Sequence, residues 1–379
     1  MTRREKISLW YDDRFRKIFL QAIIFLIVFS ILFYFGRNLV LNFRRLRLSF
    51  GFGFLFDRSA SFSIGDSPIP FSPSDPYIRA VFVGLLNSLR VMISGIILSI
   101  ALGVAIGLGR LSDNWLVRQL ATVYVETIRN TPLLLQLFFW YFAVFLQLPK
   151  IDDPLQIGAS IFISNAGIYL PFPANSLQTW LSLIIIIISL VAAWFLWRRE
   201  SDRTSEKLVF IPVSIAIIAL VFGLQWRVPR FDSIEQSIDS GLHLSSEFST
   251  LLIGLTVYTA AFIAETVRAG IQSVSKGQWE AARAIGLQPG TITRLIVFPQ
   301  ALRVMIPPLT NECLNLAKNS SLAIAIGYTD IYAVSSTIAN QTGKSVEMLI
   351  VVMATYLSFN LIVSLIMNRV NQRVKIPER

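Results

Sequence analysis

Hydrophobic residues gather in long, uninterrupted runs along this chain of 379 residues, and eight such segments stand out. Their centres lie near Ile24, Ile96, Gln136, Ile186, Ile217, Thr256, Leu316 and Tyr356. A helix needs about 20 apolar residues to cross a hydrocarbon layer roughly 30 Å thick. The run "LSLIIIIISLVAAWFLW" also lacks the alternation that is typical of a membrane β-barrel strand. The pattern predicts an all-α integral membrane protein, a bundle of about eight transmembrane helices.

The composition supports this class, since 54% of the residues are hydrophobic, 15% are charged and the mean hydropathy is +0.60. A formal charge of +11 would suggest nucleic acid for a soluble protein. Basic ends on membrane helices explain the charge better here, and we expect no nucleic-acid partner. One cysteine, Cys313, excludes an internal disulfide, and one histidine, His243, argues against a metal site built from His and Cys.

The distribution of basic residues predicts that both termini are cytoplasmic, because Lys and Arg accumulate on that side of a membrane. With this orientation, 21 of the 34 Lys and Arg residues lie in inner segments and 10 in outer segments. The stretch "FRRLRLSFGFGF" conflicts with it, because residues 44–47 carry three arginines on the outer side. An interfacial amphipathic segment could hold them near the headgroups. The first apolar run follows a basic start and lacks an Ala-x-Ala-like cleavage site, which indicates a retained anchor helix.

The predicted layout places one anchor before a larger transmembrane domain, with outer loops that are rich in Pro, Gly and Ser and are expected to be irregular. The segments are a basic N-terminus (1–17), a first helix (18–35), an external loop (36–76), the transmembrane domain (77–368) and a cytoplasmic tail (369–379). Two extra helices, at about 177–224, interrupt a smaller helical core. Ser99, Gly103 and Gly107 recur every four residues and predict a close helix contact, either within the chain or with another subunit.

A polar stretch at about 272–299 separates two apolar segments. Good helix formers occupy Gln278–Ile285, and Gly286 can adopt the left-handed conformation that ends a helix. Pro289 and Gly290 predict a turn, followed by a second short helix from Thr291 that Pro299 ends. We expect a helix, a bend and a helix outside the bilayer.

This stretch contains E-A-A, then G after three residues, and later I-x-F-P, and it resembles the coupling-loop signature of bacterial ABC importer permeases. Phenylalanine stands where that signature usually has leucine. The residues that match are Glu280, Ala281, Ala282, Gly286, Ile296, Phe298 and Pro299. Flanking stretches such as "LATVYVETIRNTPLLLQLFFWYF" and "LTNECLNLAKNSSLAIAIGY" resemble permeases of polar amino-acid importers. The block "GFGFLFDRSASFSIG" is similar to the longer Aap/Nat-type subunits.

The resemblance implies a type I importer permease in a bacterial inner membrane, carrying acidic and neutral polar amino acids. It implies that the chain itself is not an enzyme and has no cofactor, because ATP and Mg bind a dimer of partner ATPase subunits. The other implied partners are a second permease subunit, expected to be a different but related chain, a periplasmic solute-binding protein, the amino acid and membrane lipid. The residues assigned to ATPase coupling are Glu280, Ala281, Ala282, Arg283 and Gly286.

Ionisable residues inside apolar segments are candidates for the substrate site or gate, because burying them in a membrane is costly. They are Arg90, Glu126, Arg129, Glu265, Arg268, Glu312 and Lys318. The Glu/Arg pairs of "ETIR" and "ETVR" are three residues apart, so each can form a local ion pair or contact a zwitterion.

The stretch "RVMIPPLTNECLNLAKNSS" adds polar side chains near the middle of a span. Pro307 and Pro308 are expected to break the helix there, with Asn311 and Glu312 at the break. In the family that the sequence resembles, glutamine is common where Glu312 stands. Asn319, in "KNSS", is assigned to the outer gate or to a helix contact.

Two other classes of protein remain as alternatives. An ion-coupled secondary amino-acid transporter would use the intramembrane glutamates as proton or sodium sites, although the internal duplication typical of such proteins is not apparent. A membrane scaffold that merely docks an ATPase is the third interpretation.

Overall fold

The computed structural model describes residues 13–45, 49–56, 60–158, 160–198, 203–232 and 235–374. The chain divides into two compact units, residues 1–55 and 56–379. The first unit contains helix α1 (Asp13–Arg45), which is 33 residues long and therefore extends well beyond the predicted range of 18–35. Arg37, Arg44 and Arg45 consequently lie on the helix and not in a loop. Arg47 lies outside the described residues.

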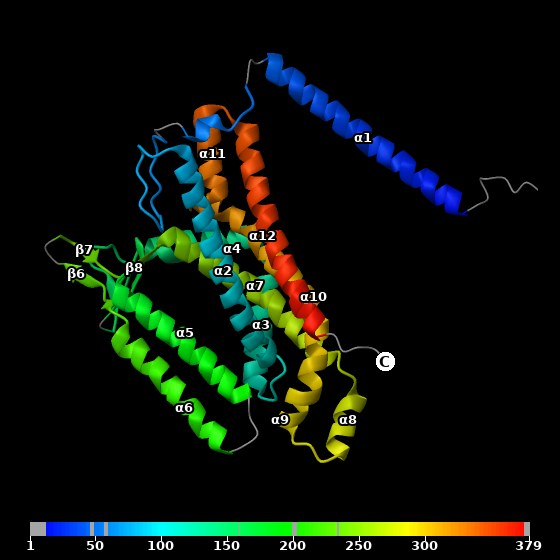
Figure 1. The fold of residues 1–379 in the computed structure, drawn as a ribbon, viewed down its shortest axis with the longest axis vertical. Coiled ribbons are helices and arrows are strands. Elements are labelled where there is room, and N and C mark those ends of the chain that lie inside the picture. Colours follow the sequence, from blue (N-terminus) through cyan, green and yellow to red (C-terminus); the bar gives the residue numbers. More distant parts are fainter. Residues whose placement is uncertain are drawn as a thin grey trace, which may run out of the picture. The chain divides into compact units, whose positions relative to one another are not determined.

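The second unit is built from helices that are joined by short helical turns and small sheets (Figure 1). Its α-helices are α2 (Tyr77–Gly109), α3 (Trp115–Arg129), α4 (Leu133–Phe138), α5 (Leu177–Arg198), α6 (Arg203–Ile218), α7 (Ser246–Gln272), α8 (Lys276–Ala284), α9 (Pro289–Ile292), α10 (Phe298–Asn319), α11 (Ile331–Thr342) and α12 (Ser345–Val374). The π and 3-10 turns are η3 (Phe139–Val144), η4 (Phe145–Gln147), η5 (Ala219–Gly223), η6 (Thr293–Val297) and η7 (Ser320–Ile326), and η2 (Gly53–Phe56) lies at the unit boundary.

Every one of the eight apolar segments contains helix in the structure, which confirms the helical class. Five helices of the described chain are long and apolar enough to cross a membrane, and they include α1, α2, α7 and α12. The fifth is continuous helical structure from Pro289 to Ile326. Three shorter apolar helices begin at Leu133, Leu177 and Phe210. The segment around Gln136 is short because the chain bends at Asn130–Pro132 between α3 and α4, where proline disfavours a continuous helix.

Helices α2 and α7 approach each other closely because small residues of α2 face α7. A Cβ atom at Gly103 would lie 2.6 Å from Ile263 Cβ, and one at Gly107 would lie 2.8 Å from the Ala264 carbonyl oxygen. Ser99, on the same face, donates a hydrogen bond of 3.4 Å to the Thr256 carbonyl. The small-residue face therefore packs inside this chain, and the alternative contact with another subunit is wrong for these residues.

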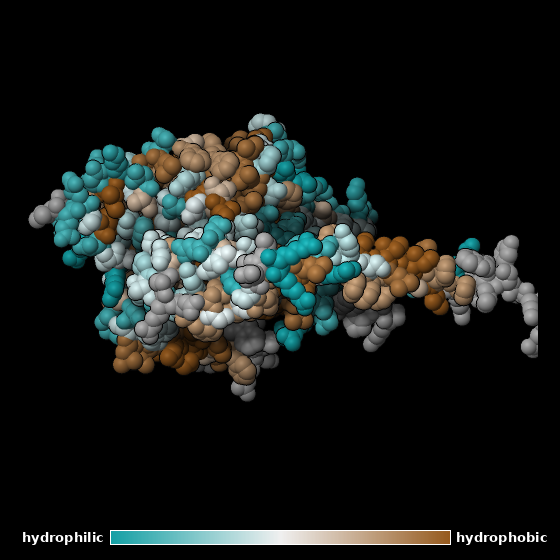
Figure 2. All heavy atoms as spheres, turned by 90° about the horizontal axis from the view of Figure 1, so that it is seen from above, coloured by the Kyte–Doolittle hydropathy of each residue, from teal (hydrophilic) through white to brown (hydrophobic). Residues whose placement is uncertain are grey.

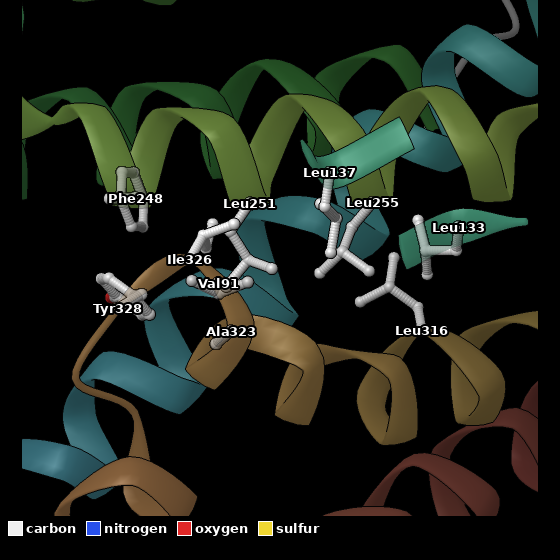
Figure 3. Packing of buried hydrophobic residues seen from close by; sticks show 10 residues of the cluster. All are labelled: Val91, Leu133, Leu137, Phe248, Leu251, Leu255, Leu316, Ala323, Ile326 and Tyr328. Atoms are coloured by element: carbon white, nitrogen blue, oxygen red, sulfur yellow. The ribbon is translucent and has the colours of Figure 1, made fainter. Parts of the chain in front are cut away.

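The largest core cluster joins α7 to α2, α4, α10 and η7 (Figure 3). Its side chains point toward one another from all of these elements and are Val91, Leu133, Leu137, Phe248, Leu251, Leu255, Leu316, Ala323, Ile326 and Tyr328. Because α7 contributes Phe248, Leu251 and Leu255 along one side, this helix forms the axis of the bundle.

The segments between η4 and α7 contain strands, so the prediction of irregular outer loops is wrong there. The strands are β1 (Leu155–Ile157), β2 (Ile161–Ser164), β3 (Gly167–Leu170), β4 (Phe172–Pro173), β5 (Trp226–Arg227), β6 (Arg230–Asp232), β7 (Ser237–Asp239) and β8 (Leu242–Ser245). The order β1-β2-β3-β8 forms an antiparallel sheet in which Tyr169 pairs with His243. Strands β4 and β5 also pair, and β6 pairs with β7.

Helices α5 and α6 form a hairpin between β4 and β5, as Figure 1 shows. Small residues allow α5 to pack closely against η5, which follows α6 directly, since a Cβ atom at Gly223 of η5 would lie 2.8 Å from Ser182 Cβ. The hairpin carries many exposed apolar side chains, including Ile184 and Ile187. Viewed from above, the molecule shows hydrophilic patches beside strongly hydrophobic ones (Figure 2). Such apolar surface is expected for a protein whose solvent is lipid.

Candidate functional site

The polar stretch after α7 forms the predicted helix and bend. Helix α8 begins at Lys276 and ends at Ala284, and Gly286 follows with φ of +79°. Leu287 N–H donates 3.2 Å to the Ala282 carbonyl, which closes the helix end in the manner of a Schellman motif. The second helix starts at Pro289, two residues before the predicted start. Proline is favourable at a first helical position because its missing N–H has no partner to lose there.

Pro299 does not end this second helix, so that prediction is wrong. Helix α9 passes through the π-turn η6 directly into α10, and Pro299 lies in the first turn of α10. A proline is tolerated in a first helical turn because the N–H groups there have no intrahelical partner.

Helix α8 presents one face to the protein and the others to solvent. Ala282 is buried at 2% exposure, whereas Glu280, Ala281 and Arg283 are exposed. Within the described chain, neither Glu280 nor Arg283 is in an ion pair. An acid, a small residue and a base therefore lie side by side on a surface that this chain leaves uncovered.

The buried face of α8 rests on a core that joins it to α7 and α10. Ala282 belongs to a cluster with Ile263, Val267, Val274, Ile292, Val297, Ala301 and Met305. Helices α7 and α10 approach closely there, since a Cβ atom at Gly270 would lie 2.2 Å from Met305 Cγ. Because protein cores are packed as densely as organic crystals, we expect a displacement of α8 to reach both long helices.

Above this core, charged side chains from α2, α3 and α7 form an inner charge cluster around Arg110. Arg110, which directly follows α2 and whose side chain is 11% exposed, forms ion pairs with Glu265 and, at 3.6 Å, with Glu126. Glu265 also pairs with Arg268, whose Nε donates to Oε2 over 3.1 Å. The expected local pair thus exists in "ETVR". In "ETIR", Glu126 instead pairs with Arg110, and Arg129 lies over the Phe262 ring at 5.3 Å.

The sequence alone did not single out Arg110 as a site residue. It follows an apolar helix directly and looks like an ordinary basic helix end. Its partner Glu265 lies 155 residues away in the sequence, so only the packing of α2 on α7 brings the two together. The available signal is the presence of one acid in each of "ETIR" and "ETVR", near the ends of two apolar segments.

Helix α10 is continuous from Phe298 to Asn319, so the predicted break at Pro307 and Pro308 is wrong. Both prolines lie inside the helix and remove two N–H donors, which leaves the carbonyls of residues 303 and 304 without their usual helical partners. Neighbouring helices stabilise such a helix, as α7 and α12 do here.

The polar residues of α10 do not all lie in one place. Glu312 is partly buried, hydrogen-bonds to the Asn315 side chain and lies within electrostatic range of Arg129 and Tyr258. Asn311 is exposed, and Asn319 is the last residue of α10. Glu312 and Arg129 therefore form an acid and a base that face a common region, while Asn319 lies seven residues after Glu312 in the chain.

The fold and this site define a multi-pass helical membrane protein in which an exposed polar helix is packed onto the ends of two long helices. The family model for "Binding-protein-dependent transport system inner membrane component" matches residues 185–376. The chain belongs to this family.

Three relatives are similar over nearly the whole chain. "General L-amino acid transport system permease protein AapQ" of Rhizobium johnstonii is 41% identical, over 98% of this chain and 95% of the relative. "Putative amino-acid ABC transporter permease protein YhdX" of Escherichia coli is 41% identical, over 90% of each chain. "Glutamate/glutamine/aspartate/asparagine transport system permease protein BztB" of Rhodobacter capsulatus is 37% identical, over 97% of this chain and 96% of the relative.

Proposed function

We propose that this chain is the permease subunit of an ABC importer for polar amino acids, with acidic and neutral ones as its cargo. The observation that carries this proposal is the similarity over nearly full length to AapQ and BztB, whose names specify general L-amino-acid transport and transport of glutamate, glutamine, aspartate and asparagine. The packing of α8 supports the same conclusion, because it provides an exposed helix through which an external motor can act.

ATP is hydrolysed in a separate pair of subunits, which also bind Mg. The exposed Glu280, Ala281 and Arg283 dock into the ATPase, and the small Ala281 allows a close approach. Closure of the ATPase pair displaces α8, and the core around Ala282 passes this motion to α7 and α10. The permease works beside a second, related permease chain in a bacterial inner membrane, and both termini face the cytoplasm.

An amino acid arrives from a solute-binding protein on the outer face and passes the region between Glu312 and Arg129. These two side chains complement a zwitterion, since Glu312 suits its ammonium group and Arg129 its carboxylate. Asn311 adds an amide, and Asn319 lies at the end of α10. The inner charge cluster (Arg110, Glu126, Glu265 and Arg268) lies between this region and α8 and forms the inner gate.

The test is reconstitution of the complete complex in liposomes with ATP and loaded binding protein, comparing Gly286→Ala with Gly290→Ala. Neither new Cβ atom meets a neighbour within 4 Å, but only Gly286 has a positive φ. An alanine in the left-handed conformation costs about 1–2 kcal/mol, so Gly286→Ala should disturb the end of α8 and Gly290→Ala should not.

Gly286→Ala should therefore lower both uptake and substrate-stimulated ATP hydrolysis, with membrane insertion unchanged. Glu280→Ala should do the same by removing a contact with the ATPase. Normal coupling in both Gly286→Ala and Glu280→Ala would overturn the role of α8. Uptake that survives ATP depletion and collapses with the ion gradient would show a secondary transporter instead.

A further inference from the structure

A hollow of about 530 Å³ opens in the second unit at the end of α7 opposite to α8. It is formed by five stretches of the chain, at residues 65–66, 146, 165–166, 243–247 and 327–329. Its lining residues include Gly65, Asp66, Ala166, His243, Glu247 and Thr329. Small-molecule sites in proteins have volumes of roughly 300–1,000 Å³, so the hollow has the size of a ligand site.

The floor of the hollow is held rigidly by Asp66. Its carboxylate accepts two hydrogen bonds from Arg90, each 3.1 Å long, and a third from Ser245 at 2.8 Å. The buried Asn87 donates to the carbonyls of Asp66, at 2.7 Å, and Thr329, at 2.9 Å. The negative charge of Asp66 is therefore balanced by Arg90, and the lining is fixed before any ligand arrives.

Glu247 gives the hollow an unbalanced negative charge. Its Oε1 accepts a hydrogen bond of 3.1 Å from the Tyr141 hydroxyl, and its side chain is only partly buried. Among the described residues, no Lys or Arg lies within ion-pair distance of Glu247. A cationic group in the hollow would meet a carboxylate that lacks a cationic partner, in a site partly shielded from water.

Donors for an anionic group lie beside this carboxylate. Ser246 and Glu247 both line the hollow and are the first two residues of α7, whose backbone N–H groups have no partner within the helix. The next N–H, of Phe248, is already bound by the Ser245 hydroxyl at 3.1 Å. A helix of 27 residues also carries a partial positive charge at this end.

The small sheet between η4 and α7 provides one wall of the hollow. Asn165 and Ala166 connect β2 to β3, and His243 lies on β8. The His243 ring stacks on Tyr169 at 4.4 Å and its Nε2 lies 3.0 Å from the Ala166 carbonyl, so the wall is held in place. The strands that the sequence did not predict thus have a specific role in completing this hollow.

We propose that the hollow is an outer holding site for a free α-amino acid. The ammonium group of the amino acid binds the Glu247 carboxylate, and its carboxylate binds the N–H groups of Ser246 and Glu247. The amino acid waits there before it moves along α7 toward Glu312 and Arg129. This inference rests on the proposed function, and it adds a second binding position, at the outer end of the pathway.

The test measures equilibrium binding of radiolabelled L-glutamine to the purified complete complex, without ATP and without binding protein. Glu247→Gln keeps the size of the side chain and removes its charge. The matched control is Glu235→Gln, at an exposed acid between β6 and β7. We expect Glu247→Gln to weaken binding at this site about tenfold, which corresponds to 1.4 kcal/mol. Glu235→Gln should bind as the unmodified complex does, and Glu312→Gln should leave the outer site intact.

A second variant, Gly65→Leu, tests the site by filling it. A Cβ atom at Gly65 meets nothing within 4 Å and the residue has no positive φ, so the fold should accept the larger side chain. We expect it to lower the amount of bound L-glutamine. Equal binding by Glu247→Gln, Gly65→Leu and Glu235→Gln would overturn the holding site. If the unmodified complex takes up no amino acid, the proposed function fails first.

Discussion

The contact between α2 and α7 yields a quantitative prediction, because two glycines of α2 differ in the space around them. A Cβ atom at Gly103 would lie 2.6 Å from Ile263 Cβ and 2.9 Å from the Ala260 carbonyl oxygen. A Cβ atom at Gly95 would lie 3.4 Å from Leu316, which is an ordinary contact distance. Both glycines are buried in the same helix, so Gly95→Ala is a matched control for Gly103→Ala.

The expected magnitude follows from two opposing effects. Replacing glycine by alanine inside a helix stabilises it by about 1 kcal/mol, and both variants gain this equally. Overpacking a close contact costs about 1–3 kcal/mol, and only Gly103→Ala carries this cost, since a backbone carbonyl cannot rotate away. The two variants should therefore differ by about 1–3 kcal/mol, with Gly95→Ala the more stable.

Thermal unfolding of the purified complex in detergent, followed by near-ultraviolet circular dichroism, measures this difference. The melting temperature of Gly103→Ala should lie below that of Gly95→Ala by several degrees, at equal protein concentration and detergent. Equal melting temperatures, or a more stable Gly103→Ala, would refute the close contact between these two helices.

Two further predictions concern charged groups. Replacing Arg110 by alanine removes the ion-pair partner of Glu126 and leaves Glu265 with Arg268 alone. We expect the free energy of unfolding to fall by about 1–3 kcal/mol. Thermal unfolding measures this loss, with the exposed Arg118→Ala as the control. The second prediction concerns Asp330, which lies between the apolar segments that end at Ile326 and begin at Ser345. Burial raises the pKa of its carboxyl group to about 7. The folded protein then binds a proton that the unfolded chain releases near pH 4, so stability should fall as the pH rises from about 4 to 7 and level off above. Asp330→Asn should flatten this part of the curve of melting temperature against pH, and a curve identical to that of the unmodified protein would contradict the buried carboxyl.

The sequence was most informative where the physics is local. The α8 helix and its end at Gly286 could be predicted because helix formers, a left-handed glycine and a following proline act over a few neighbouring residues. The apolar segments were equally clear, since lipid imposes a minimum length of hydrophobic helix. The ends of α1 were less well predicted, because helix and apolar run do not stop at the same residue.

Features that depend on distant partners could not be predicted in this way. Strand β3 has four residues, which are too few for a clear alternation of apolar and polar side chains. It pairs with β8 because the α5–α6 hairpin, which lies between them in the sequence, brings the chain back beside β3. The two prolines of α10 were expected to break it, but packing against α7 and α12 keeps the helix continuous. Similarly, Arg110 looks in the sequence like an ordinary basic residue at a helix end, because its partners lie on α3 and α7.

Helix α7 connects the two sites physically, because it begins at the outer hollow and ends just before α8. Its 27 residues span about 40 Å and include no proline. Kinks in long helices arise almost always at prolines, at small-residue pairs or at inserted turns. The chain between α8 and α10 differs, since the π-turn η6 interrupts regular helix there and such turns often mark functional sites. We therefore expect α7 to move as one body with α2, while the bending that accompanies each cycle occurs near η6. Gly103→Ala should therefore reduce ATP-driven uptake in the liposome assay as well as stability, because it disturbs the close packing through which α2 follows α7.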